Sequence, residues 1–288
     1  MIPSIPQPRF YKGLYTAYVA VFFVYLAAPL IVVAVFAFND SQFPSMPWNG
    51  ATLKWFFGDT RPAIGIFNDR QLLRSIGTSG FVAIWVTALA VFVGTCNAFL
   101  FERAHFPGKN LLYVVALSPL VIPGVILGIS ILVFSNAIAN NVEETFGWDL
   151  AFLRPGLFLV IIGQFAFVTT ITTLVISARL RKFDFSLEEA ALNLGATRAA
   201  AIRTITIPFL KPALIGAAII AFLMSFENFN TTLMLVGSDA PLTITMFDRL
   251  KQGSTPALNA LSLMLMVVSG ALALLAVFAQ RGGQGDKT

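Results

Sequence analysis

Five long stretches of this chain contain no charged residue. They are residues 13–39, 75–101, 110–142, 155–178 and 252–280, and each has at least 24 residues. A membrane-crossing helix needs about 20 mainly apolar residues, because it rises about 1.5 Å per residue through a hydrocarbon core near 30 Å thick. Each stretch is therefore long enough to form a membrane span.

A sixth apolar run, residues 212–238, contains one acid, Glu227. Acids inside a span are costly and usually functional, so this run is either a span with a functional carboxylate or a broken segment. We predict a span, and hence an all-α polytopic membrane protein with six transmembrane helices. We expect residues 1–75 to hold the first helix and a long outer loop, residues 76–281 the transmembrane core, and residues 282–288 a tail.

Composition excludes several other classes of protein. Only 11% of the residues are charged, whereas a soluble domain carries about 25%. Cys96 is the only cysteine and His105 the only histidine, so we expect neither an intrachain disulfide nor a metal site. The pI is about 9.6, but the basic residues are scattered between the spans, so we expect no nucleic-acid partner.

The basic residues also predict the orientation in the membrane. Six spans place both termini on one side, and that side carries twelve Lys and Arg residues against seven on the other. Because Lys and Arg are enriched in cytoplasmic loops, we expect both termini in the cytoplasm. The first apolar run is longer than the apolar region of a signal peptide, so it should remain as the first span.

The predicted outer segment, residues 40–74, is too long for a plain connection between two spans. It contains Trp48, Trp55, several prolines and mixed charge. It either docks an external partner or forms an ordered cap whose tryptophans lie at the level of the lipid headgroups.

The longest predicted cytoplasmic loop has the pattern of two short helices that meet at a glycine. Ser186 followed by Glu189 is a capping box, which predicts the start of the first helix. Gly195 favours the left-handed conformation that follows a helix end, and Thr197 can cap the second helix. We expect this second helix to end or kink at Pro208, which lacks a backbone N–H.

Small and apolar side chains in this loop predict a surface that another molecule can approach closely. Ala190 and Ala191 are small, and Leu192 and Leu194 offer apolar contact. The loop either enters a groove of a partner protein or lies as an amphipathic linker against the membrane surface.

The same loop contains a motif with fixed spacing. Three residues separate Ala191 from Gly195, and nine separate Gly195 from Ile205. The members of the motif are Glu189, Ala190, Ala191, Gly195, Ile205 and Pro208. The motif resembles the EAA loop of the membrane subunits of bacterial ABC importers of the type I fold, with Ile207 in place of the usual leucine. The resemblance implies that residues 179–208, called here the EAA loop, form a cytoplasmic coupling-helix loop that receives an ATPase subunit.

Nearly the whole chain further resembles the polyamine permeases, specifically the second permease of spermidine and putrescine importers. Residues 225–237 and 256–265 carry this resemblance. It implies a subunit of the bacterial inner membrane that forms half of the translocation path for a small cationic solute such as a polyamine. A permease of the same class for an amino acid derivative or a sugar is the alternative. A secondary transporter would show internal repeats, and the sequence has no convincing one.

The resemblance also implies the partners. They are two ATP-binding cassette subunits that use ATP and Mg, a sister permease, and an external solute-binding protein. This chain is expected to be non-catalytic and to bind no cofactor, and its sequence lacks a G-x-x-x-x-G-K-[ST] phosphate loop.

We expect the sister permease to be non-identical, because this chain offers only one membrane carboxylate to line a path. Glycines that permit close helix approach, either to the sister or within this subunit, are Gly77, Gly80, Gly94, Gly124, Gly128 and Gly163.

The candidate substrate path comprises Glu227, Asn230 and Thr231. On a continuous helix Glu227 lies about 24 Å beyond Lys211, and Asn230 and Thr231 share its face. The ionised carboxylate would attract an ammonium group of a cationic substrate. Alternatively, Glu227 is a structural carboxylate that hydrogen-bonds the sister subunit or remains protonated.

An intramembrane enzyme is a further alternative, with Glu227, Asp248 and His105 as its acid and base groups. We expect these residues in a span, an outer loop and a cytoplasmic loop, respectively. They are therefore too far apart to share a proton within hydrogen-bond distance.

Overall fold

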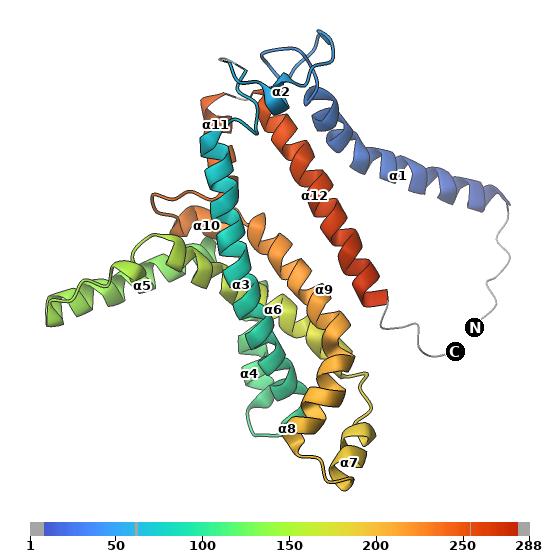
Figure 1. Ribbon diagram of the computed structural model, residues 1–288, viewed down its shortest axis with the longest axis vertical. Coiled ribbons are helices and arrows are strands. Elements are labelled where there is room, and N and C mark those ends of the chain that lie inside the picture. The colour runs from blue at the N-terminus through green and yellow to red at the C-terminus, as the bar shows by residue number, and fades with distance from the viewer. Residues whose placement is uncertain (1–8, 61–62, 254, 282–288) are drawn as a thin grey trace. The chain divides into compact units, whose positions relative to one another are not determined.

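The computed structural model describes residues 9–60, 63–253 and 255–281. Within these residues six helical stretches are long and apolar enough to cross a membrane (Figure 1). The prediction of an all-α chain with six spans is therefore confirmed. The predicted tail, residues 282–288, lies outside the described residues.

The described part of the chain is built from helices and turns. In chain order they are α1 (Arg9–Phe36), α2 (Lys54–Phe57), α3 (Arg70–Arg103), α4 (Lys109–Leu117), α5 (Gly124–Phe146), α6 (Leu157–Leu180), α7 (Ser186–Asn193), α8 (Arg198–Ala201), α9 (Ile207–Phe226), α10 (Asn230–Leu235), α11 (Leu242–Gln252) and α12 (Pro256–Arg281). Two 3-10 turns, η1 (Ser118–Leu120) and η2 (Ala151–Leu153), and one π turn, η3 (Ile202–Thr206), lie between them. In chain order the six spans are α1, α3, α5, α6, the continuous stretch from α8 to α9, and α12.

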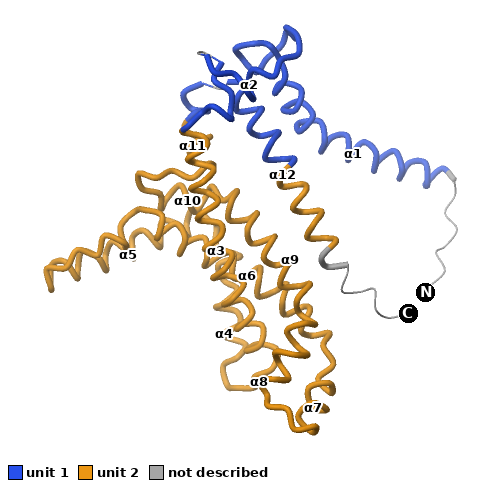
Figure 2. The backbone as a smooth tube through the Cα atoms, viewed as in Figure 1, with its two compact units in different colours: residues 1–70, 249–267 blue, residues 71–248, 268–288 orange. Residues whose placement is uncertain are grey.

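The chain divides into two compact units (Figure 2). The first consists of residues 1–70 and 249–267, and the second of residues 71–248 and 268–288. Helices α3, α11 and α12 contribute residues to both.

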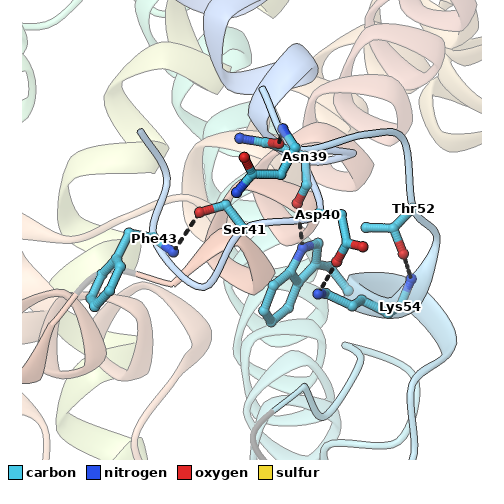
Figure 3. A network of polar contacts seen from close by, with 8 residues as sticks. Asn39, Asp40, Ser41, Phe43, Thr52 and Lys54 are labelled. Carbon is cyan, nitrogen blue, oxygen red and sulfur yellow. Dashed lines mark hydrogen bonds and ion pairs between the residues drawn. The ribbon is translucent and has the colours of Figure 1, made fainter. Parts of the chain in front are cut away.

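In the first unit, an ordered cap follows α1. Trp55 is 3% exposed, and its indole Nε1 donates to the backbone oxygen of Asn39 at 2.9 Å. Asp40 forms an ion pair with Lys54 beside this contact (Figure 3). Trp48 stays exposed, so the two tryptophans of the predicted outer segment differ: one is inside the cap and the other is on its surface.

In the second unit, α6 is the central helix. Of the six candidate spans it is the most buried, with 56% of its most apolar 18-residue window inside the structure. One apolar cluster joins it to α3, α9 and α10, and its buried members are Val82, Val86, Ala90, Leu159, Val160, Val168, Ala221 and Leu235. A second cluster lies nearer the C-terminal end of α6, and its buried members are Ala98, Ile176, Leu180, Phe183, Leu210 and Ala217.

Glycines allow helices to approach closely within this unit. A Cβ atom on Gly94 would meet Thr172 Oγ1 and lie 3.0 Å from the Thr173 backbone nitrogen. Three further glycines, Gly124, Gly128 and Gly163, face residues of α10 in the same way. A Cβ atom added to Gly77 or to Gly80 would meet no described atom within 4 Å. Four of the six glycines that we selected therefore pack within this subunit.

The third apolar run, residues 110–142, is divided by prolines. Helix α4 ends at Leu117, Pro119 lies in the following 3-10 turn, and Pro123 precedes α5. Proline cannot donate a backbone hydrogen bond and clashes with the preceding turn. Only α5 in this run is long enough to span.

The sixth apolar run is also broken, and our prediction of a single span over residues 212–238 is wrong. Helix α9 ends at Phe226, and α10 begins at Asn230. Glu227 is the first residue after α9 and has left the helical path.

Buried polar side chains explain this break. Gln164 on α6 is 1% exposed; its Nε2 donates to Thr232 Oγ1 at 2.8 Å, and its Oε1 accepts from Ser225 Oγ at 2.5 Å. Asn228 Oδ1 accepts from Thr232 Oγ1 at 3.2 Å. These bonds join the last turn of α9 to α10 and satisfy polar groups that would otherwise be costly to bury.

We predict that Gly94→Ala destabilises the protein. The new methyl group would push against Thr172, whose hydroxyl donates to the Ala90 backbone oxygen at 2.7 Å. Overpacking costs about 1–3 kcal/mol, against a gain in helix propensity of about 1 kcal/mol. Thermal unfolding of the purified protein in detergent should show a lower Tm.

Gly77→Ala is the matched control, because Gly77 lies on the same helix with open space around it. It should leave the Tm unchanged or raise it. A Tm for Gly94→Ala equal to that of Gly77→Ala would contradict the close packing of α3 against α6.

Candidate functional site

The EAA loop forms the predicted arrangement of helix, glycine and helix. Helix α7 begins at Ser186, and Gly195 follows it with a φ of +87°. The Ala196 N–H donates to the Ala191 oxygen at 3.0 Å, the bond that closes a helix end around a left-handed glycine. Thr197 Oγ1 accepts from the Ala200 N–H at 3.2 Å and caps α8. The glycine corner and the second cap are therefore confirmed.

The predicted capping box is wrong. The acceptor at the start of α7 is Asp184 Oδ1, which receives the Ser186 N–H at 3.0 Å. Ser186 is already inside the helix, and the residue before it, Phe185, has helical dihedral angles and no capping side chain. Asp184, two residues ahead, takes the backbone donor that the capping box assigns to Glu189, and Glu189 is exposed.

Pro208 does not end the second helix. A π turn, η3, follows α8, and Pro208 then lies in the first turn of α9. Proline has no N–H to donate to a preceding turn, and the π turn directly before α9 already interrupts the α-helical hydrogen-bond pattern there. Helical backbone therefore continues from Arg198 to Phe226.

The motif residues of the EAA loop divide between two surroundings. Glu189, Ala190 and Gly195 are exposed at the corner, and Ala191 is half-buried beside them. Ile205 instead packs against the second apolar cluster at the base of the loop. The corner also presents exposed leucines, of which Leu194 is 89% exposed.

The inner face of α7 carries an ion pair that sequence reasoning missed. Arg103, the last residue of α3, donates from Nη1 to Glu188 Oε2 at 2.9 Å and from Nη2 to Glu188 Oε1 at 2.7 Å. The two side chains are 20% and 16% exposed. The available signal was the pair of adjacent glutamates at 188 and 189, of which a helix can turn only one toward the protein.

A second ion pair lies next to the first. Arg181 Nε donates to Glu102 Oε1 at 2.9 Å, and joins the end of α6 to the end of α3. The hydrogen bond and negative charge of Glu102 raise the pKa of the Arg181 guanidinium.

The candidate path residues lie at the break between α9 and α10. Glu227 is exposed, and its Oε1 accepts from Ser269 Oγ on α12 at 2.7 Å. Asn230 is also exposed, whereas Thr231 is 2% exposed and donates to the Gly124 oxygen at 3.3 Å. The shared helical face that we expected does not form, because the helix ends before Glu227.

The other acid and base candidates lie on separate elements. His105 is in the connection between α3 and α4, and Asp248 is on α11. Among the described residues no group of three or more His, Cys, Asp or Glu side chains could hold a metal ion.

Known proteins resemble this chain over most of its length. The putrescine transport system permease protein PotI of Escherichia coli K12 is 29% identical over 256 residues, which cover 88% of this chain and 86% of PotI. The spermidine/putrescine transport system permease protein PotC of the same strain is 27% identical over 271 residues, which cover 92% of each chain.

A solved structure shares the fold. A chain of a bacterial ABC transporter involved in the import of the acidic polysaccharide alginate superposes with a TM-score of 0.69, covering 97% of this chain and 100% of that chain at 19% identity. Residues 88–282 match the family described as the inner membrane component of binding-protein-dependent transport systems. Since this match covers more than half of the sequence, the chain belongs to that family and is a multi-pass permease subunit of an inner-membrane transport system.

Proposed function

We propose that this permease forms half of the path of an ATP-driven importer for a small cationic solute such as a polyamine. Its EAA loop receives an ATP-binding cassette subunit. The observation that carries the proposal is the exposed corner of α7, Gly195 and α8 in a permease of this family.

The chemistry of the corner suits a protein partner. Leu187 is 51% exposed and Leu194 is 89% exposed, and Ala190 lies exposed between them on α7. Apolar side chains at the centre of a contact supply most of its binding energy, and the small alanine lets a partner backbone come close. Glu189 adds a charge at the first turn. The partner would bind ATP and Mg, since this sequence has no phosphate loop.

The proposed contact with an ATPase requires the EAA loop to face the cytoplasm. With six spans, both termini then also lie on the cytoplasmic side, which agrees with the excess of Lys and Arg on that side. The predicted outer segment, most of which belongs to the first unit, then faces the external solute-binding protein.

The solute class rests on the relatives and on Glu227. Both named relatives are permeases of systems for putrescine or for spermidine and putrescine, and they align with about nine tenths of this chain. Such solutes carry ammonium groups. The exposed Glu227 carboxylate beside the exposed Asn230 would attract one of these groups transiently.

The other half of the path would come from a sister permease. The described part of this chain offers only one carboxylate at the break between α9 and α10, and a non-identical sister would complete the lining. We therefore propose a heterodimer of permeases with two ATPase subunits.

We predict that Gly195→Val uncouples ATP hydrolysis from transport. No described atom lies within 4 Å of the position of a new Cβ, so the effect would come from the φ of +87°. This conformation costs a β-branched residue about 1–2 kcal/mol, and the corner would change shape. Uptake per ATP hydrolysed should fall in proteoliposomes that contain the complete transporter.

Gly147→Val is the control, because Gly147 has a φ of +69°, follows α5 and also has open space around it. It imposes similar strain away from the EAA loop and should leave coupling intact. Equal coupling in both variants would remove the EAA loop from the ATPase contact.

We predict that Glu227→Gln reduces uptake of radiolabelled putrescine while the complex still assembles. The substitution keeps the shape and an acceptor for Ser269 but removes the charge. Ser269→Ala separates the two roles, because it removes the hydrogen bond and keeps the carboxylate. If Ser269→Ala lowers uptake as much as Glu227→Gln, Glu227 is structural.

The solute itself can be identified on the external solute-binding protein. We expect polyamines to raise its Tm, because a ligand at 100 times its Kd stabilises a protein by about 2.7 kcal/mol. The same screen includes amino acids and sugars. Stabilisation by a sugar alone would contradict the cationic solute.

A further inference from the structure

We infer that Arg103 is a positioning residue that links the EAA loop to the second span. Through Glu188 it fastens α7 to the end of α3, so that a displacement of the loop moves α3 as well as α9. The inference rests on the proposed contact between the EAA loop and an ATPase subunit, and extends it to the route by which that contact reaches the membrane.

The contact between Arg103 and Glu188 has a fixed geometry. Two parallel hydrogen bonds, of 2.9 and 2.7 Å, join the guanidinium to both carboxylate oxygens. Such paired bonds between charged groups are strong and restrict orientation. Because each side chain is at most 20% exposed, solvent and salt screen the pair less than a surface ion pair.

Aromatic rings hold the guanidinium in place. Its central carbon lies 4.5 Å from the ring centroid of Phe99, 5.1 Å from that of Phe185 and 5.9 Å from that of Phe183. Phe99 belongs to α3, and the other two rings belong to the connection between α6 and α7. Cation–π contacts of this kind favour a desolvated arginine over a lysine.

The same carboxylate also contacts the helical stretch that leads into the fifth span. Thr206 Oγ1 donates to Glu188 Oε1, and Thr206 is fully buried at the end of the π turn. Glu188 thus joins three elements: α7, the end of α3 and the entry to α9. A force applied to the exposed side of α7 reaches both spans through one side chain.

The neighbouring ion pair provides a matched comparison. Glu102 and Arg181 are joined at 2.9 Å, but they connect α3 to the end of α6 and do not involve α7. Glu102 is 14% exposed, close to the 16% of Glu188. Removing the charge of Glu102 therefore perturbs the same end of α3 without releasing α7.

A cysteine of α3 that can be labelled chemically lines the same cavity as the ion pair of Arg103 and Glu188. Arg103 and Glu188 line a cavity of about 730 Å³, together with Cys96 on α3 and Arg198 on α8. Cys96 is exposed and is the only cysteine in the chain. Its reaction with a maleimide reports a change in the space between α3 and the EAA loop.

The test uses the complete transporter in proteoliposomes, with cysteines removed from the partner subunits. The rate of Cys96 labelling is compared without nucleotide and with ATP plus vanadate. In the wild type we expect nucleotide to change this rate. Glu188→Gln should abolish most of the change and lower uptake of putrescine per ATP hydrolysed by about fivefold or more.

Glu102→Gln should keep both the nucleotide response and the uptake ratio. Arg103→Lys keeps the charge but loses the paired bonds, so it should resemble Glu188→Gln; it also serves if Glu188→Gln fails to copurify with the partners. The inference is overturned if nucleotide does not change the rate of Cys96 labelling in the wild type. It is also overturned if Glu188→Gln and Glu102→Gln give the same nucleotide response and the same uptake per ATP hydrolysed.

The results also distinguish this inference from the proposed function. If Gly195→Val uncouples transport while Glu188→Gln keeps the Cys96 response, the EAA loop still receives the ATPase and only the link to α3 fails. If Gly195→Val also has no effect, the proposed contact itself is wrong.

Discussion

The second unit depends on the two hydrogen bonds that the side-chain amide of Gln164 forms. A membrane interior offers no water to backbone or side-chain polar groups, so a break in a span requires protein partners. Gln164 provides them from the first half of α6 by binding Ser225 at the end of α9 and Thr232 in α10. The short helix α10 can then lie against α5 and α6, with glycines at the contacts. Glu227 becomes exposed because the helix ends just before it.

Charge-free runs were sufficient to predict the number of spans, because a bilayer imposes a minimum length that few other structures meet. They could not predict where a run is interrupted. Prolines at 119 and 123 were visible in the sequence as a reason for the division before α5. The break after Phe226 has no such local mark, since it depends on Gln164, which is 61 residues away from Ser225 along the chain.

The EAA loop was predictable where its geometry is local. Gly195 and Thr197 act on their own backbone neighbours, and the structure shows both in the expected roles. The start of α7 was predicted at the right residue for the wrong reason. The side chains of Asp184 and Glu189 can both accept the Ser186 N–H, and sequence alone does not decide between them. The partner of Glu188 lies 85 residues away. Only the folded chain brings these two residues together.

The π turn η3 has a consequence for the angular register of the fifth span. Each residue of an α-helix turns the chain by about 100°, and a π turn arises when one extra residue is accommodated in a helix. The five residues of η3 lie between the corner that carries Thr197 and the end that carries Glu227. One residue more or less in this turn would therefore rotate α9, with its proposed solute-facing side, by roughly a quarter of a revolution relative to α7 and Gly195. The number of residues in η3 thus sets the direction in which the end of α9 faces. Deleting one of them would turn the proposed solute path away from its present direction without changing any side chain that lines it.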